Sequence, residues 1–351
     1  MMPKINLLFV LFSLQIIPNV AISSGELDQV VLVEKRSNAE DVSYSESREG
    51  RNIAQPLSLL PSSPVPMDKS IMWPYSANGL LRMEWIPKQE DPDHKFYRSG
   101  SGTLIAPRYV LTAAHNIYKD HKNYSTVGAY EFDQTKNEPK YIDFFPGKNY
   151  PSGSTYNPDK INEYCPFGKV SVEKIFVDSR YIEGLRNYKD RVVSDKEDID
   201  YHEKNIFPYD YALLLLNEDI GKRAGYIEIG CPDDETLKKS KLSVYGYPAE
   251  KNPLFGPESS DEQLMSGFVM FGDAGRVESV DSNRIYYDIE TGKGASGAGL
   301  TSQVGSGQPC TVGVHTFGPN NSNDTRLKPF NSGTRITEDK FNKIKEWMRE
   351  K

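Results

Sequence analysis

Residues 288–300 read DIETGKGASGAGL, a strand-like run that leads directly into five small residues centred on Ser296. Glycine is favoured where a backbone bends sharply or where another group must approach it closely. A serine held in such a bend has an exposed hydroxyl flanked by backbone N–H groups. The stretch is therefore either a tight turn, which it favours when taken alone, or a nucleophile beside an oxyanion hole.

Short runs of branched and aromatic residues recur from about residue 66 onward, each bounded by Gly, Pro, Asn or Asp. Examples are SGTLIAP, YVLTAA, YALLLLN, LSVYGYP and RIYYDIE. Many short strands with few helices between them predict an all-β sandwich or barrel. The last segment differs, because Thr337 can cap a helix on which Phe341, Ile344, Trp347 and Met348 share a face.

The composition excludes several classes of function. The 351 residues carry a formal net charge of −7 and show no Lys/Arg cluster, so nucleic acid is not an expected partner. Neither a C-x-x-C pair nor a Cys/His cluster is present, so we expect no metal and no cofactor. The three cysteines, Cys165, Cys231 and Cys310, permit one disulfide bond, and all three pairings stay open.

The N-terminal region predicts a secreted protein. A short basic start, the apolar run INLLFVLFSLQII and the small residues around Ala21 are typical of a signal peptide over 1–23, with a membrane anchor as the alternative. Once this segment is removed, we expect no membrane association. Residues 24–64 are charged and rich in Ser and Pro, which indicates a pro-segment or a disordered region.

Residues 65–351 are expected to form the folded domain, with insertions around 119–168 and 184–206. Three N-x-[ST] sequons, at Asn123, Asn320 and Asn323, are compatible with a glycoprotein.

Two further residues, together with Ser296, form a candidate site for nucleophilic catalysis. A serine needs a base to remove its proton, and the base needs a carboxylate to hold its tautomer. His115 ends the run YVLTAAH, and Asp210 precedes the apolar run YALLLL. A half-buried core histidine and a strand-start aspartate are the alternatives. The chain order His115, Asp210, Ser296 is that of the chymotrypsin class, whereas the Gly-x-Ser-x-Gly elbow of α/β hydrolases fails at Ala298.

At these blocks the chain resembles a known family. LTAAH, DYALLLL and GASG are similar to the signature blocks of trypsin/chymotrypsin-fold serine proteases, over roughly residues 70–351. The resemblance implies two packed antiparallel six-stranded barrels with a C-terminal helix. It also implies Ser296 as nucleophile, His115 as base and Asp210 as its orienting carboxylate, with the backbone N–H groups of Gly294 and Ser296 as the oxyanion hole.

The surroundings of Ser296 resemble one subgroup, the glutamyl endopeptidases. Ala295 stands where trypsin-like enzymes have an aspartate, and Thr291 lies five residues before Ser296. His315 lies in GVHTFG, which is similar to the histidine motif of that subgroup. The resemblance implies a pocket formed by Thr291 and His315, cleavage after Glu or Asp, and a zymogen whose new amino terminus near Val65 completes the pocket. Ala298-Gly299 depart from the Ser-Pro usual there.

The expected function is thus that of a secreted serine endopeptidase acting on protein or peptide substrates, itself cut by an activating protease. Two alternatives stay open: a protease-fold binding protein without turnover, and an active serine protease with a preference for non-acidic residues.

Overall fold

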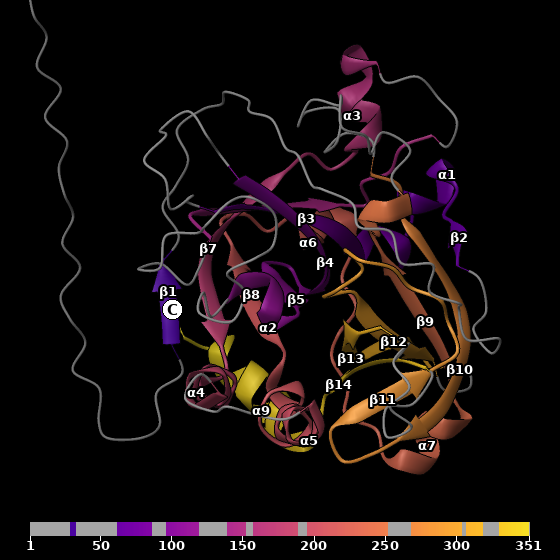
Figure 1. The fold of residues 1–351 in the computed structure, drawn as a ribbon. Helices are drawn as coiled ribbons and strands as arrows, with labels where there is room; N and C mark the ends of the chain where they lie inside the picture. The colour runs from indigo at the N-terminus through magenta and orange to yellow at the C-terminus, as the bar shows by residue number, and fades with distance from the viewer. Residues whose placement is uncertain are drawn as a thin grey trace, which may run out of the picture.

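The computed structural model of the chain describes residues 29–32, 62–85, 96–118, 139–151, 157–188, 195–251, 268–303, 307–318 and 330–350. Two antiparallel sheets of seven strands make up most of this part of the chain (Figure 1). The first sheet consists of β1 (Gln29–Leu32), β3 (Asn78–Trp85), β4 (Phe96–Ala106), β5 (Tyr109–Thr112), β6 (Tyr141–Pro146), β7 (Val170–Val177) and β8 (Ala212–Leu216). The second consists of β2 (Ser63–Pro64), β9 (Lys241–Gly246), β10 (Phe271–Val280), β11 (Arg284–Tyr287), β12 (Gly299–Gln303), β13 (Cys310–Phe317) and β14 (Asn331–Arg335).

Six strands of each sheet close into a barrel. In the first sheet β8 pairs with both β5 and β7, and in the second β11 pairs with both β14 and β10. Closure leaves one additional strand outside each barrel, β1 on β7 and β2 on β10. The expected pair of six-stranded antiparallel barrels is therefore confirmed.

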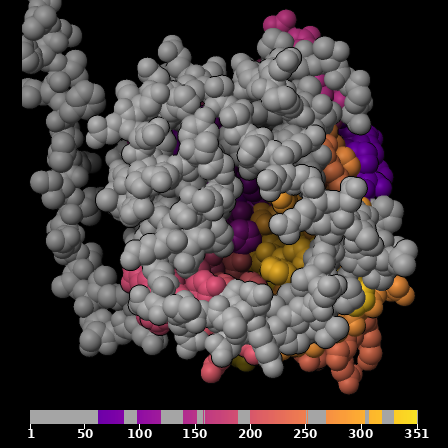
Figure 2. Space-filling model, viewed as in Figure 1, coloured from indigo at the N-terminus to yellow at the C-terminus, as the bar shows by residue number. Residues whose placement is uncertain are grey.

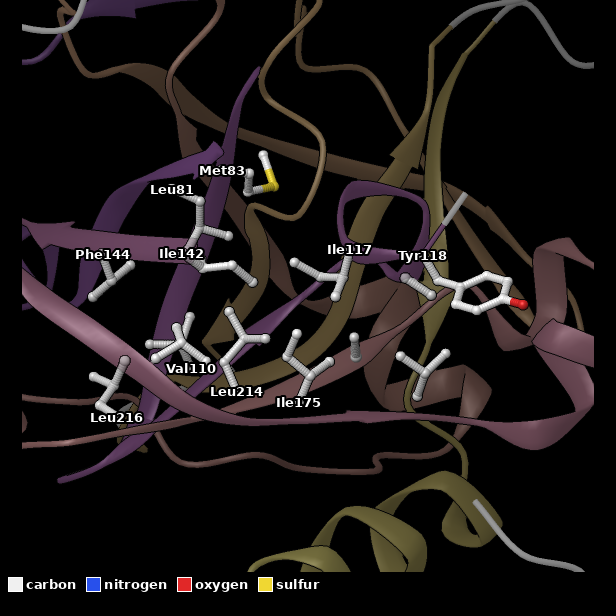
Figure 3. Close-up of a cluster of buried hydrophobic side chains, with 14 of the residues drawn as sticks. Leu81, Met83, Val110, Ile117, Tyr118, Ile142, Phe144, Ile175, Leu214 and Leu216 are labelled. Carbon is white, nitrogen blue, oxygen red and sulfur yellow. The ribbon is translucent and has the colours of Figure 1, made fainter. Parts of the chain in front are cut away.

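Strand β8 shows why an unbroken apolar run forms a strand here. All five of its residues are buried. Ala212, Leu214 and Leu216 face the core of the first barrel, where they join Val110, Ile175 and their neighbours (Figure 3). Leu213 and Leu215 face a second cluster on the opposite side of the strand. Because both faces are covered, the strand needs no polar alternation.

The second face of β8 is covered by the C-terminal helix α9 (Glu338–Trp347). Its Trp347 stacks on Phe176 of β7, with ring centroids 5.9 Å apart, and lies 5.6 Å from the ring of Tyr211. The helix follows the last strand of the second barrel in the chain but packs against the first (Figure 1). It therefore ties the two barrels together. The expected C-terminal helix is confirmed, although the Thr337 side chain makes no capping hydrogen bond.

The other helices are short or lie in the connections. They are α1 (Met67–Ser70), α2 (Ala114–Ile117), α3 (Ile161–Tyr164), α4 (Ser179–Tyr188), α5 (Asp195–Asn205), α6 (Gly221–Ala224) and α7 (Asp234–Lys239), with 3-10 turns η1 (Tyr75–Ala77), η2 (Pro158–Lys160), η3 (Phe207–Tyr209) and η4 (Ala249–Lys251). Within the described residues, no helix is long and apolar enough to cross a membrane.

The structure refines the predicted insertions. The range 119–168 contains β6, which pairs with β3 and belongs to the first barrel. The charged range 184–206 contains the second half of α4 and the whole of α5, and the Tyr201 hydroxyl of α5 donates to the Gly184 carbonyl of α4 at 2.8 Å. The three sequons and the proposed signal peptide lie outside the described residues.

The expected disulfide bond is not formed in the structure. Cys165, Cys231 and Cys310 are free thiols. Cys310 lies beside Gly230, the residue before Cys231, and the Cys231 thiol adds to the effect of burial in raising the pKa of Cys310. Cys165 lies elsewhere, 3.6 Å from the Lys148 ammonium.

Candidate active site

The two oxygens of the Asp210 carboxylate hold the backbone and the ring of His115. The His115 backbone N–H donates to Asp210 Oδ1 at 2.9 Å, and Nδ1 lies 2.7 Å from Oδ2. Asp210 follows η3 and is buried, with 6% of its side chain exposed, whereas 26% of the His115 side chain is exposed. A carboxylate only accepts hydrogen bonds, so Nδ1 carries the proton and Nε2 presents a lone pair. The arrangement is that of a base with a fixed tautomer.

Ser296 comes from the second barrel but is anchored to the first. Its carbonyl accepts from the Ser101 N–H of β4 and from the Asn116 side chain, each at 2.8 Å. Asn116 is the residue after His115, so this bond places the serine loop against the short helix that carries the histidine. Ser296 is half-buried, and its Oγ hydrogen-bonds to none of the described residues. Such bonds often form only with substrate present.

Gly297 is required for this close approach. Its φ is +91°, and a Cβ at this position would collide with the Ser101 carbonyl and the Thr112 hydroxyl. Both the left-handed backbone and the lack of space exclude a side chain.

On the face shown in Figure 2, purple atoms of the first barrel and yellow atoms of the C-terminal strands reach the surface near the centre.

Two backbone N–H groups beside the serine have no partner among the described residues. Among the described residues, the N–H groups of Gly294 and Ser296 have no acceptor, whereas those of Ala295, Gly297 and Ala298 are bonded. The carbonyls of the same two peptide units are held: Lys293 O accepts from Ala249 N at 2.7 Å, and Ala295 O accepts from Ala298 N at 2.9 Å. In a trans peptide the N–H points away from its carbonyl, so these bonds set the direction of the two free donors. Such a pair can bind an oxyanion.

His315 lies directly behind the serine loop. Its carbonyl accepts from Gly297 N and its N–H donates to Ala298 O, each at 2.8 Å. The ring is buried and bonded on both sides, to the Tyr287 hydroxyl at 2.5 Å through Nδ1 and to the Thr291 hydroxyl at 3.1 Å through Nε2. The structure thus brings His315 and Thr291 together in one site.

Burial, assisted by the nearby His115, lowers the pKa of His315 to about 3, against the opposing effects of the Ser332 backbone and Asp210. The ring is therefore neutral at physiological pH.

Four residues at this site have no signal in the sequence. Ser101 and Asn116 anchor the serine loop, and Tyr287 and Asn331 contact the candidate pocket. Asn116 follows His115 directly in the chain, so its position near the site could be inferred from the sequence. Ser101, Tyr287 and Asn331 lie at the site because of the way in which their strands pair. Ser101 pairs with Leu80 of β3, and Asn331 with Tyr287 itself across β14 and β11.

No protein-family model matches the chain. It is 31% identical over 152 residues to serine protease 23 of Mus musculus, which covers 43% of this chain and only 33% of that relative. It is 23% identical over 296 residues to an extracellular metalloprotease of Bacillus subtilis (strain 168), covering 82% of this chain and 71% of the relative. Within the described residues, no group of three or more His, Cys, Asp or Glu could hold a metal ion.

A solved structure, a Glu endopeptidase in complex with MPD, superposes with a TM-score of 0.52 at 21% identity, covering 82% of this chain and 95% of that one. The fold is that of trypsin and chymotrypsin. The predicted resemblance to the fold of this class of serine proteases is confirmed.

Proposed function

We propose that the chain is a serine endopeptidase in which Ser296, His115 and Asp210 form the catalytic triad. The observation that supports this most directly is the two-point contact between His115 and Asp210. It lies beside a serine loop in which two N–H groups have no acceptor among the described residues. The contact fixes a tautomer, which a general base requires.

The reaction proceeds in two halves. As Ser296 Oγ bonds to the scissile carbonyl carbon, His115 Nε2 takes the hydroxyl proton, and the N–H groups of Gly294 and Ser296 hold the resulting oxyanion. Nε2 then gives this proton to the leaving amine, the C–N bond breaks, and an acyl-enzyme ester remains. A water molecule repeats the sequence: it loses a proton to Nε2, bonds to the acyl carbon and displaces Ser296 Oγ, which recovers the proton.

For the substrate we propose a side chain that ends in a polar group, held by Thr291 and His315. The resemblance to glutamyl endopeptidases favours glutamate, with aspartate less readily cut. The His315 imidazole can donate to such an oxygen, and so can the Thr291 hydroxyl once it turns from Asn331 Oδ1, to which it donates at 2.9 Å in the structure. The superposed solved structure is that of a Glu endopeptidase, which agrees with this choice.

We also propose that residues 1–23 direct secretion and that part of 24–64 is removed from a zymogen by another protease. Mass determination of the N-terminus of the secreted protein tests both cleavages.

The proposed activity is tested with a fluorophosphonate probe and a peptide substrate. Wild-type protein should be labelled at Ser296 and should cleave the peptide, and Ser296→Ala should lose both properties. Absence of labelling and of cleavage in correctly folded wild-type protein would instead favour a protease-fold binding protein.

A further inference from the structure

Asp210 is the central residue of an inverse γ-turn. Its φ of −77° and ψ of +67° are typical of this turn, and the Tyr211 N–H donates to the Tyr209 carbonyl across it at 2.8 Å. The turn decides where the Cα–Cβ bond of Asp210 points, and therefore which atoms its carboxylate can reach.

The position of the carboxylate depends on this turn. Among the described residues, the Asp210 carboxylate accepts hydrogen bonds only from His115, at 2.9 Å from the backbone N–H and 2.7 Å from Nδ1. No second side chain of this part of the chain holds the two oxygens in place. The residues on either side of Asp210 are thus the ones through which the rest of the molecule can set its position.

Both of these neighbours are anchored to one ion pair, formed just after β7 and in the first turn of α4. The Tyr211 hydroxyl donates to Asp178 Oδ2 at 2.6 Å. Arg180 donates to the same carboxylate through Nε at 2.9 Å and Nη2 at 2.7 Å. Its guanidinium also lies 4.4 Å from the centroid of the Tyr209 ring. The pair Asp178–Arg180 therefore holds both flanks of the turn at once.

Burial restricts the geometry of this ion pair. Only 1% of the Asp178 side chain is exposed, so its charge depends on the partners that it has in the folded protein. Burial, to which Asp178 adds, raises the pKa of Tyr211 well above its usual value, so the hydroxyl stays protonated and remains the donor. The guanidinium is held in addition by Asp339 of α9, at 3.0 Å.

Resting on the proposed endopeptidase function, we propose that Asp178, Arg180 and the Tyr211 hydroxyl are positioning residues for Asp210. They act on the reaction only through the turn, which they hold so that the carboxylate meets His115.

The test uses the full chain with Arg180→Met, which removes the ion pair and the stacking on Tyr209 but keeps an unbranched side chain. We expect kcat to fall about 10- to 100-fold while KM stays within about twofold, because a displacement of about 1 Å at a positioned group lowers the rate and leaves the binding cleft unchanged. Tyr211→Phe removes only the hydroxyl and should lower kcat by about three- to tenfold. The Tm of each variant is measured on the same samples.

Arg82→Met is the matched control. Arg82 belongs to the same barrel and also pairs with a buried carboxylate, that of Asp143, at 2.7 Å, with its guanidinium 5.4 Å from the centroid of the Tyr97 ring. This variant should lower the Tm as Arg180→Met does and leave kcat unchanged, a difference that a general loss of structure would not produce.

A second comparison separates positioning from an effect on the whole site. In an Asp210→Asn background the turn has no carboxylate to place, so Arg180→Met should change neither kcat nor the rate of fluorophosphonate labelling any further. An equal fall in both backgrounds overturns the positioning role, and so does a wild-type kcat in Arg180→Met; both results leave the endopeptidase standing. A wild-type protein that is neither labelled nor active overturns the endopeptidase and the positioning role together.

Discussion

Replacing Asp210 by asparagine should abolish the base without disturbing the fold. In the structure the His115 N–H needs an acceptor at Oδ1, and Nδ1–H needs one at Oδ2. The asparagine side chain has one acceptor and one NH₂ donor. If its oxygen keeps the backbone N–H, its NH₂ points at Nδ1, which must then become the acceptor. The ring proton moves to Nε2, the atom that should take the proton from Ser296.

The size of the effect follows from this switch of tautomer. We expect kcat to fall on the order of 10⁴-fold, or about 5 kcal/mol of transition-state stabilisation, while KM changes little. The effects of substituting Asp210 and Ser296 should not add, since these groups act as one unit. The double variant Asp210→Asn/Ser296→Ala should therefore be no slower than Ser296→Ala alone.

The assay is hydrolysis of a fluorogenic peptide, with thermal unfolding measured on the same samples. Asp233→Asn is the matched control, because Asp233 caps α7 through Thr236 N at 2.8 Å and asparagine caps equally well. It should keep full activity. An Asp210→Asn protein within tenfold of wild type would refute the assignment of His115 as base.

Three further outcomes can be measured. Gly297→Ala should destabilise by about 3 kcal/mol or more and remove activity, whereas Gly168→Ala, at φ +75° with open space around it, should cost only about 1 kcal/mol in chemical denaturation. Trp347→Ala should cost about 3–5 kcal/mol in the same measurement, because the ring is fully buried against the first barrel. In secreted protein, peptide mapping without reductant should find Cys310 linked to Cys231; two free thiols would contradict this pairing.

The fold could be predicted because its signals are local. The run at β8 is apolar throughout, and α9 has a single apolar face, so each identifies its own type of element. Strand β6 was hidden by the turn-forming residues on both sides of it. The helices α4 and α5 were hidden by the charged residues of this range, although Tyr181, Ile182, Leu185 and Tyr201 join the core of the first barrel.

The site was predictable only in part, for a related reason. His115, Asp210 and Ser296 lie in short blocks that can be compared one at a time, and their roles remain a proposal. Tyr287 and Asn331 lie opposite each other on paired strands, 44 residues apart in the chain (331 − 287). Nothing in either segment indicates the partner, because strand register is decided by the closure of the whole barrel.

The hydrogen bonds of the Ser101 hydroxyl matter for molecules in which the two barrels are not correctly packed. It donates to the Gly294 carbonyl at 2.8 Å and accepts from Tyr247 N at 2.9 Å, so a residue of the first barrel holds the loop of the second. A molecule whose barrels have separated loses these hydrogen bonds, and its serine loop is no longer held next to His115. Under the proposed function, errors of assembly should therefore yield inactive molecules rather than weakly active ones.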